Sequence, residues 1–120
     1  MTLSKYQKNN LVKLNQLLRF VRTSLGSDIT VQRLLILVNV YLNEGMSQNE
    51  LLSNLDSTSV TALSRNLADL SSVTSQKKSG PGLIELKVDM MNLRKKRIYL
   101  TEKGRNFLTE LLVQETFKNV

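Results

Sequence analysis

The chain has 120 residues and a formal net charge of +7, and 41% of its residues are hydrophobic. This length suits a single domain, residues 1–120, with enough apolar side chains for a core that needs no disulfide or structural metal. Because the sequence has neither Cys nor His, it excludes thiol nucleophiles, imidazole bases and nearly every structural zinc site, so no metal and no cofactor are expected.

The first predicted helix spans about residues 4–25. Its apolar residues follow one another at spacings of 3, 4, 3 and 4, namely Leu11, Leu14, Leu18, Val21 and Leu25. This rhythm is typical of a helix that packs along another helix, and Gly26 offers a stop. The stripe fits a subunit interface and an ordinary core helix equally well.

Residues 30–43 predict a second helix that is apolar almost all the way round, with Gln32, Arg33 and Asn39 as the main interruptions. Such a helix belongs in the middle of a domain. Gly45 can end it. A short strand can follow before the next helix.

A helix-turn-helix is predicted at about residues 47–71. Ser47 and Glu50 have the spacing of a capping box, in which each side chain binds the other's main-chain amide, and this short helix runs from about residue 48 to near Asn54. The cluster 56–58 is expected to cap the next helix. That helix has an apolar stripe, which we expect to be buried: Val60, Leu63, Leu67 and Leu70.

The opposite face of this helix carries small polar side chains, among them Asp69, around one long donor, Arg65. A solvated helix face would more often alternate Glu and Lys, so the face favours contact with base edges; a plain surface helix is the alternative. The residues expected to contact DNA from this recognition helix are Thr58, Ser59, Thr61, Ala62, Arg65 and Asn66.

Residues 71–82 contain the only Pro and two of the five Gly, and they predict a loop. The alternating run 84–88 then predicts a strand that pairs with residues 95–100 across a turn at 89–94, giving a wing at about residues 83–100. In the second strand Ile98 and Leu100 should face the core, while Arg97 and Tyr99 face away.

Positive charge is concentrated around this hairpin: residues 77–105 hold nine of the seventeen basic side chains and only three acidic ones. Such a patch supplies phosphate affinity. The wing residues expected to contact DNA are Arg94, Lys95, Lys96 and Arg97, although Arg97 can instead anchor the wing stem. Further candidates for phosphate contacts are Ser47, Gln48, Lys77 and Lys78.

Thr101 is expected to cap a last helix that runs to about residue 117. Its apolar band pairs with the first helix as a candidate dimer interface, made of Leu11, Leu14, Leu18, Val21, Phe107 and Leu111. The predicted fold is therefore mainly α with a small β-hairpin, a winged helix-turn-helix of order α-α-α-α-β-β-α. No apolar run reaches the roughly twenty residues that span a bilayer, and we expect a cytoplasmic protein.

The segment 29–112 resembles the winged-helix regulators of the multiple antibiotic resistance regulator (MarR) family. The resemblance is carried by Thr30-Val31-Gln32, by the recognition-helix run 63–70, by Gly82-Leu83-Ile84-Glu85 and, most specifically, by the run from Arg94 to Gly104. It implies a homodimer with interlocking terminal helices, two recognition helices in successive major grooves and two wings along the flanking minor grooves.

Two features depart from that family's pattern. Asn92 stands where the family usually has an acidic residue that braces the wing, so a hydrogen bond or Asp89 should replace the ion pair. About eight extra residues, including Lys77 and Lys78, separate the recognition helix from the Gly-Leu-Ile strand.

These features predict a sequence-specific regulator of transcription that binds double-stranded DNA as a homodimer, most simply a repressor. The alternatives are a winged-helix protein of plasmid or phage replication or partition, and a protein-interaction module. Enzymatic activity is not expected, because phosphate loops, metal-ligand clusters and nucleophile-base pairs are missing from the sequence. Nothing in the sequence supports a small-molecule effector.

Overall fold

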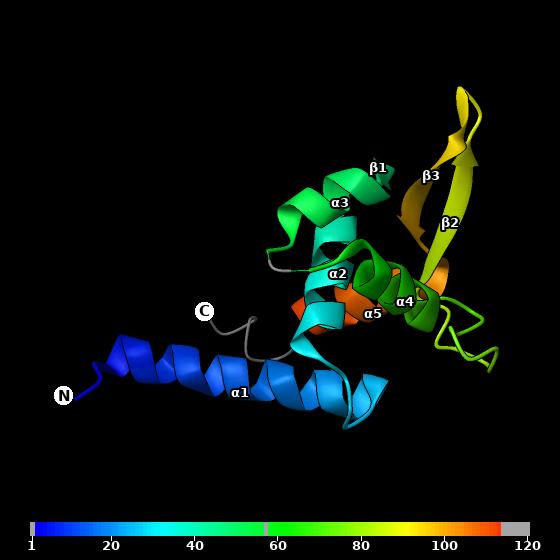
Figure 1. Cartoon of the computed structure of the whole chain (residues 1–120). Helices are drawn as coiled ribbons and strands as arrows, with labels where there is room; N and C mark the ends of the chain where they lie inside the picture. The colour runs from blue at the N-terminus through cyan, green and yellow to red at the C-terminus, as the bar shows by residue number, and fades with distance from the viewer. Residues whose placement is uncertain (1, 57, 114–120) are drawn as a thin grey trace. The chain divides into compact units, whose positions relative to one another are not determined.

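The computed structural model describes residues 2–56 and 58–113. Its elements in chain order are α1 (Lys5–Leu25), α2 (Val31–Leu42), β1 (Met46–Ser47), α3 (Gln48–Asn54), α4 (Val60–Leu70), β2 (Ile84–Asp89), β3 (Asn92–Leu100) and α5 (Glu102–Leu112) (Figure 1). They fall into two compact units, of which Thr30–Leu108 is one and the described residues outside it are the other. This order confirms the predicted winged helix-turn-helix, and β1 is the short strand that the sequence left open. None of the described helices is both long and apolar enough to cross a bilayer.

Helix α1 is capped at both ends. The Ser4 hydroxyl accepts from the Gln7 amide at 3.1 Å, and the Gln7 side chain accepts from the Ser4 amide at 2.8 Å, a capping box that the sequence analysis missed. Gly26 ends the helix as predicted, in a conformation with φ +106° that suits glycine.

Helix α2 begins after Thr30, whose hydroxyl accepts from the Arg33 amide at 3.2 Å. The expectation that it is buried all round is wrong: Ile36, Leu37 and Val40 are fully buried, but Val31 and Leu42 are 75% and 69% exposed. The helix packs on α3, α4 and β3, and part of its apolar surface stays exposed. It ends at Leu42, earlier than Gly45, which instead turns the chain into β1 with φ +88°.

Helix α3 begins at the predicted cap, where the Ser47 hydroxyl accepts from the Glu50 amide at 3.2 Å. The second half of the predicted capping box differs, because the Glu50 carboxylate accepts from the Ser47 hydroxyl rather than from its amide. The reason is that the Ser47 main chain belongs to β1, where it pairs with Arg97.

Helix α4 begins later than predicted. Its cap is Ser59, whose hydroxyl accepts from the Ala62 amide at 3.0 Å, so the predicted cap at 56–58 is wrong, and Ser57 itself lies outside the described residues. Val60 is 65% exposed, because as the first helical residue it extends beyond the packed surface. The rest of the predicted stripe is buried, namely Leu63, Leu67 and Leu70.

The three strands form an antiparallel sheet of order β1-β3-β2. The β2–β3 hairpin is the predicted wing, and it projects from the helices of its unit (Figure 1). Ile98 and Leu100 are buried as expected, at 0% and 3% exposure.

The pairing in the hairpin passes from Val88 opposite Lys96 to Asp89 opposite Asn92, so β3 has three extra residues there that form a bulge, 93–95. The turn is Met90 and Met91 alone, shorter than the predicted 89–94.

The loop 71–82 is closed on itself. Val73 bridges to Ser79, and the Leu83 amide donates to the Leu70 carbonyl at 2.8 Å, which joins the two ends of the loop. A Cβ on Gly80 would lie 2.1 Å from the Ser71 carbonyl oxygen, so the closure requires glycine.

Thr101 caps α5, since its hydroxyl accepts from the Gly104 amide at 3.0 Å. Gly104 lies directly against the segment before β2, where an added Cβ would be 2.0 Å from the Leu83 carbonyl oxygen. The helix is described as far as Leu112, and the predicted extension over residues 114–117 lies outside the described residues.

Candidate nucleic-acid interface

Two of the predicted base-reading residues on α4 have unengaged side chains. Arg65 and Thr61 are both exposed, and neither makes a side-chain hydrogen bond or an ion pair with any described residue. Ala62 lies half-buried between them on the same helix. The guanidinium of Arg65 therefore has its full set of donors for a ligand.

Three other predicted contacts are engaged within the protein. The Thr58 hydroxyl accepts from the Gln32 side chain at 2.7 Å, the Ser59 hydroxyl caps α4, and Oδ1 of Asn66 accepts from Nε of Arg33 at 3.2 Å. These oxygens position the helix, and the Nδ2 amide remains as the group that Asn66 can offer to a base.

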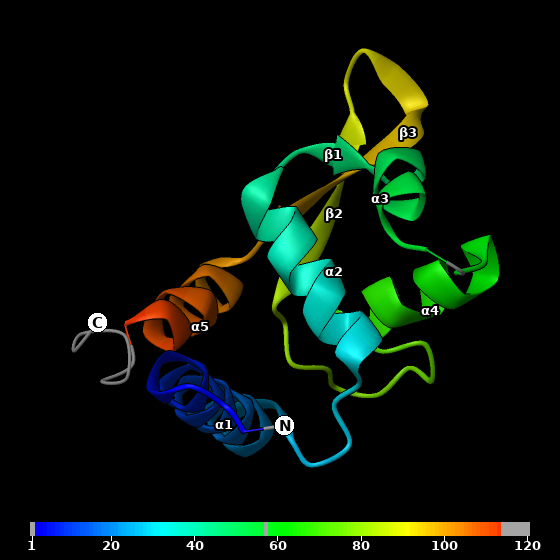
Figure 2. The ribbon, with the colours of Figure 1, turned by 90° about the vertical axis from the view of Figure 1, so that its left-hand side faces the viewer.

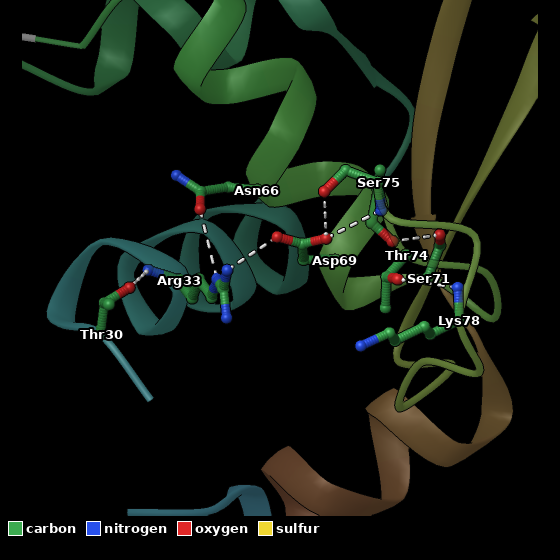
Figure 3. Close-up of polar contacts among 9 residues, drawn as sticks. Thr30, Arg33, Asn66, Asp69, Ser71, Thr74, Ser75 and Lys78 are labelled. Atoms are coloured by element: carbon green, nitrogen blue, oxygen red, sulfur yellow. Dashed lines mark hydrogen bonds and ion pairs between the residues drawn. The ribbon is translucent and has the colours of Figure 1, made fainter. Parts of the chain in front are cut away.

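Arg33 and Asp69 hold α4 in place, a role that the sequence analysis missed. Nη2 of Arg33 lies 2.8 Å from Oδ2 of Asp69, and both the amide and the hydroxyl of Ser75 donate to Oδ1, at 2.9 and 2.8 Å (Figure 3). The Ser75 amide, followed by its hydroxyl and by the charges of Arg33 and Arg65, lowers the pKa of Asp69 against the opposing effect of burial. The signal in the sequence was Arg33, a charge within an apolar helix.

Asp89 organises the wing in a similar way. Its Oδ1 accepts from the Met91 amide at 2.8 Å, and its Oδ2 accepts from Nε of Arg97 at 3.0 Å. Nη1 of Arg97 donates to the Gly45 carbonyl at 2.7 Å, so Arg97 anchors the wing stem to the segment before β1. The hydrogen bond from Met91 is the main cause that lowers the pKa of Asp89.

Asp89 does make an ion pair within the wing, but its partner is Arg97 in the wing stem and not Arg94, the residue that matches the family's arginine. Asn92 supplies the expected hydrogen bond as well, because its Oδ1 accepts from the Arg94 amide at 3.2 Å. On the outer face of the sheet, Nζ of Lys87 lies 5.1 Å from the centre of the Tyr99 ring, a cation–π contact.

The wing cations meet the start of α3 in one pocket. Arg94, Lys95 and Lys96 line it together with Ser47, Gln48 and Asn49, and its volume is about 140 Å³. Figure 2 shows α3 next to β1 and β3, which explains how these segments come together. The pocket thus brings the three wing cations together with Ser47 and Gln48, which were predicted as possible phosphate contacts. Asn49 is a further lining residue that was not predicted. Lys77 and Lys78 do not line this pocket; both are exposed on the 71–82 loop.

The chain matches no protein-family model and no curated protein. A solved structure of a MepR mutant from S. aureus, bound to an oligodeoxyribonucleotide, superposes with a TM-score of 0.65 and 22% identity, over 88% of this chain and 70% of that one. The chain has the MarR-like winged-helix fold. A mutant of MarR from E. coli complexed with operator DNA superposes with a TM-score of 0.63 and 22% identity, over 93% of this chain and 74% of that one. The transcriptional repressor CouR bound to a 23-mer DNA duplex superposes with a TM-score of 0.63 and 20% identity, over 95% of this chain and 74% of that one.

In this MarR-like fold α4 is the second helix of the helix-turn-helix and the β2–β3 hairpin is the wing.

The candidate dimer residues divide into two sets. Leu11, Leu14 and Leu18 are 52%, 49% and 51% exposed in the single chain. The other candidates are already buried in the single chain, namely Val21, Phe107 and Leu111.

Proposed function

We propose that this protein is a sequence-specific regulator of transcription that binds double-stranded DNA as a homodimer, most simply as a repressor that occludes a promoter. The observation that carries the proposal is that one unit presents both kinds of contact that recognition needs. Arg65 is exposed on α4 and bonded to none of the described residues, and three wing cations line a pocket with the start of α3. Solved structures with this fold are bound to DNA.

The division of labour follows from the chemistry of each group. Arg65 can donate two hydrogen bonds to O6 and N7 of guanine, and Thr61 and the Asn66 amide can bind neighbouring bases. Arg94, Lys95 and Lys96 bind phosphates, which give affinity and orientation without reading sequence.

The homodimer is supported by the exposed stripe on α1. Three Leu side chains at helical spacing, each about half exposed, leave apolar surface that a second copy of the chain can bury. Two recognition helices related by a dyad should meet half-sites about 10 base pairs apart, measured between centres.

Selection of binding sites from random duplexes tests this proposal. We expect a pseudo-palindrome for the wild type and a loss of selectivity at the guanine positions for Arg65→Ala, since that variant lacks the bidentate donor. Direct repeats, or no motif at all, would contradict the proposal. Mapping of bound DNA across the genome then distinguishes a regulator, with sites at promoters, from a partition protein, with arrays of sites.

A further inference from the structure

The tip of the wing is apolar. Its two turn residues, Met90 and Met91, are 84% and 94% exposed, and Leu93 in the adjacent bulge is 72% exposed. An exposed apolar cluster at the end of a projecting hairpin is a site for contact with another molecule. In the fold this tip lies at the far end of the hairpin from α5 (Figure 1).

Hydrogen bonds from neighbouring side chains stabilise the Met turn. Asp89 accepts the Met91 amide at 2.8 Å with one carboxylate oxygen and is paired with Arg97 through the other. The Arg94 amide, on the other side of the turn, donates to Asn92 at 3.2 Å. Because these hydrogen bonds restrain the turn, less conformational entropy of the backbone is lost when the tip binds.

The residues behind the tip select the partner. Arg94 and Lys95 lie in the bulge and Lys96 follows it, so three successive cations begin three residues after Met91 on the same hairpin. An apolar tip followed by cations is chemically complementary to the minor groove of duplex DNA, where an apolar base stack lies between two rows of phosphates. Met is among the residues that proteins insert there, and its unbranched side chain adapts to a narrow gap.

We propose that Met90 and Met91 form a wedge that enters the minor groove, partly unstacks one base step and bends the DNA. This inference rests on the proposed function and extends it. The cost of unstacking is offset because the bent duplex brings its phosphates onto Arg94, Lys95 and Lys96. The wedge favours flexible TA and CA/TG steps at the position of the tip, so it adds specificity where no base accepts a hydrogen bond.

The experiment uses the full-length protein and a duplex that the wild type selects, with a dye at each end and 2-aminopurine at the step under the wing. The wild type should bend the duplex by about 20–90° and increase 2-aminopurine fluorescence. The pair Met90→Gln and Met91→Gln keeps the length of the side chains but makes them polar. It should leave the duplex straight and weaken binding by about tenfold.

The matched control is the pair Met90→Leu and Met91→Leu, which stays apolar and should keep the bend. The Leu pair should keep the wild-type dependence of affinity on salt, whereas the Gln pair should make that dependence shallower, because a straight duplex does not bring its phosphates onto Arg94, Lys95 and Lys96. All four substitutions are at exposed positions, and thermal unfolding verifies that the variants fold.

The outcomes separate the two proposals. A wild type that selects no sequence contradicts the proposed function. If the wild type selects a site but leaves it straight, or if the Gln pair bends it equally, the wedge is wrong and the proposed function stands. A tip that instead binds lipid or another protein also leaves the duplex straight, and so overturns the wedge.

Discussion

Nη2 of Arg33 on α2 lies 2.8 Å from Oδ2 of Asp69 on α4, and Nε of the same guanidinium donates to Asn66 at 3.2 Å. One side chain of α2 therefore holds two residues of α4. Asp69 extends the connection to the 71–82 loop, since it accepts both donors of Ser75 (Figure 3). The direction in which α4 presents Arg65 depends on these polar contacts as well as on the packing of its Leu stripe.

Arg33→Ala should lower the free energy of unfolding by about 1–2 kcal/mol, because it removes two hydrogen bonds and leaves the Asp69 carboxylate without its ion-pair partner. Arg65→Ala is the matched control, since it deletes the same side chain where that side chain bonds to no described residue, and it should change stability by less than about 0.5 kcal/mol. Urea unfolding measures both. Equal effects of the two substitutions would show that the Arg33 contacts contribute nothing.

Stability should decrease in acid in a way that depends on Asp69. Its pKa is lowered in the folded state, so it contributes stability above the pKa of the unfolded chain, about 3.9, and that contribution is lost as the pH falls through the lower folded value. Asp69→Asn should therefore flatten the dependence of stability on pH below about pH 4. Asp89 shifts in the same direction, so some dependence should remain. Urea unfolding at a series of pH values measures the slope, and an unchanged slope in Asp69→Asn would refute this account.

Gly104→Ala should destabilise the fold by about 1–3 kcal/mol, because the new Cβ would meet the Leu83 carbonyl oxygen and force α5 away from the main chain before β2. Asn106→Ala, at an exposed position of the same helix, should change stability by less than about 0.5 kcal/mol. Thermal unfolding compares the two variants. If Gly104→Ala is as stable as the wild type, the close approach of α5 to Leu83 is wrong.

Sedimentation should give twice the mass of one chain at micromolar concentration. Leu14→Asp should shift the protein toward the monomer, because it places a carboxylate in the proposed apolar interface. Gln16→Asp introduces the same side chain on the other face of α1 and should leave the assembly unchanged. A wild type that is monomeric under these conditions would refute the homodimer and, with it, the two-fold DNA site.

Substitutions in the wing and in α4 should have different effects on DNA binding. Lys95→Ala with Lys96→Ala should weaken binding to every duplex and make the dependence of log K on log salt shallower, by about one unit for each phosphate interaction that the substitution removes in each subunit. Arg65→Ala should instead cost about 1–3 kcal/mol on the specific duplex alone. Fluorescence anisotropy on a specific and a scrambled duplex at several salt concentrations measures both.

The comparison for the wing is the loop pair Lys77→Ala with Lys78→Ala. These cations lie outside the pocket at the start of α3, so the change in salt dependence should be smaller than for the wing pair. If Arg65→Ala weakens both duplexes equally in a folded protein, the assignment of α4 as the base-reading helix is wrong.

The sequence predicted what depends on local spacing. The stripe of Leu63, Leu67 and Leu70 follows from helical periodicity, and the alternation at Ile98 and Leu100 follows from the two-residue repeat of a strand. Both are confirmed by burial. The cap of α4 was predicted at 56–58 instead of Ser59, because several neighbouring polar residues can each act as a cap.

Contacts between distant parts of the chain could not be predicted from the sequence. Asn66 was expected to contact DNA, but its oxygen is held by Arg33, which is 33 residues away along the chain. Periodicity also does not say how many neighbours an apolar helix has, which is why the exposed side of α2 was unexpected. The pocket that joins Arg94 to Gln48 depends on the pairing of β1 with β3, and that pairing was not predicted.

The hydrogen bond from the Leu83 amide to the Leu70 carbonyl means that residues 71–82 leave the domain and return to it at one point. Chain length in this segment can therefore change without displacing the strand that follows, as in other surface loops that accept inserted sequence. The junction between Gln76 and Lys77 is a suitable place to splice in an epitope or a small reporter domain. Such a fusion leaves the sequences of α4 and of Ser75 unchanged, and the inserted domain would report the position of the protein.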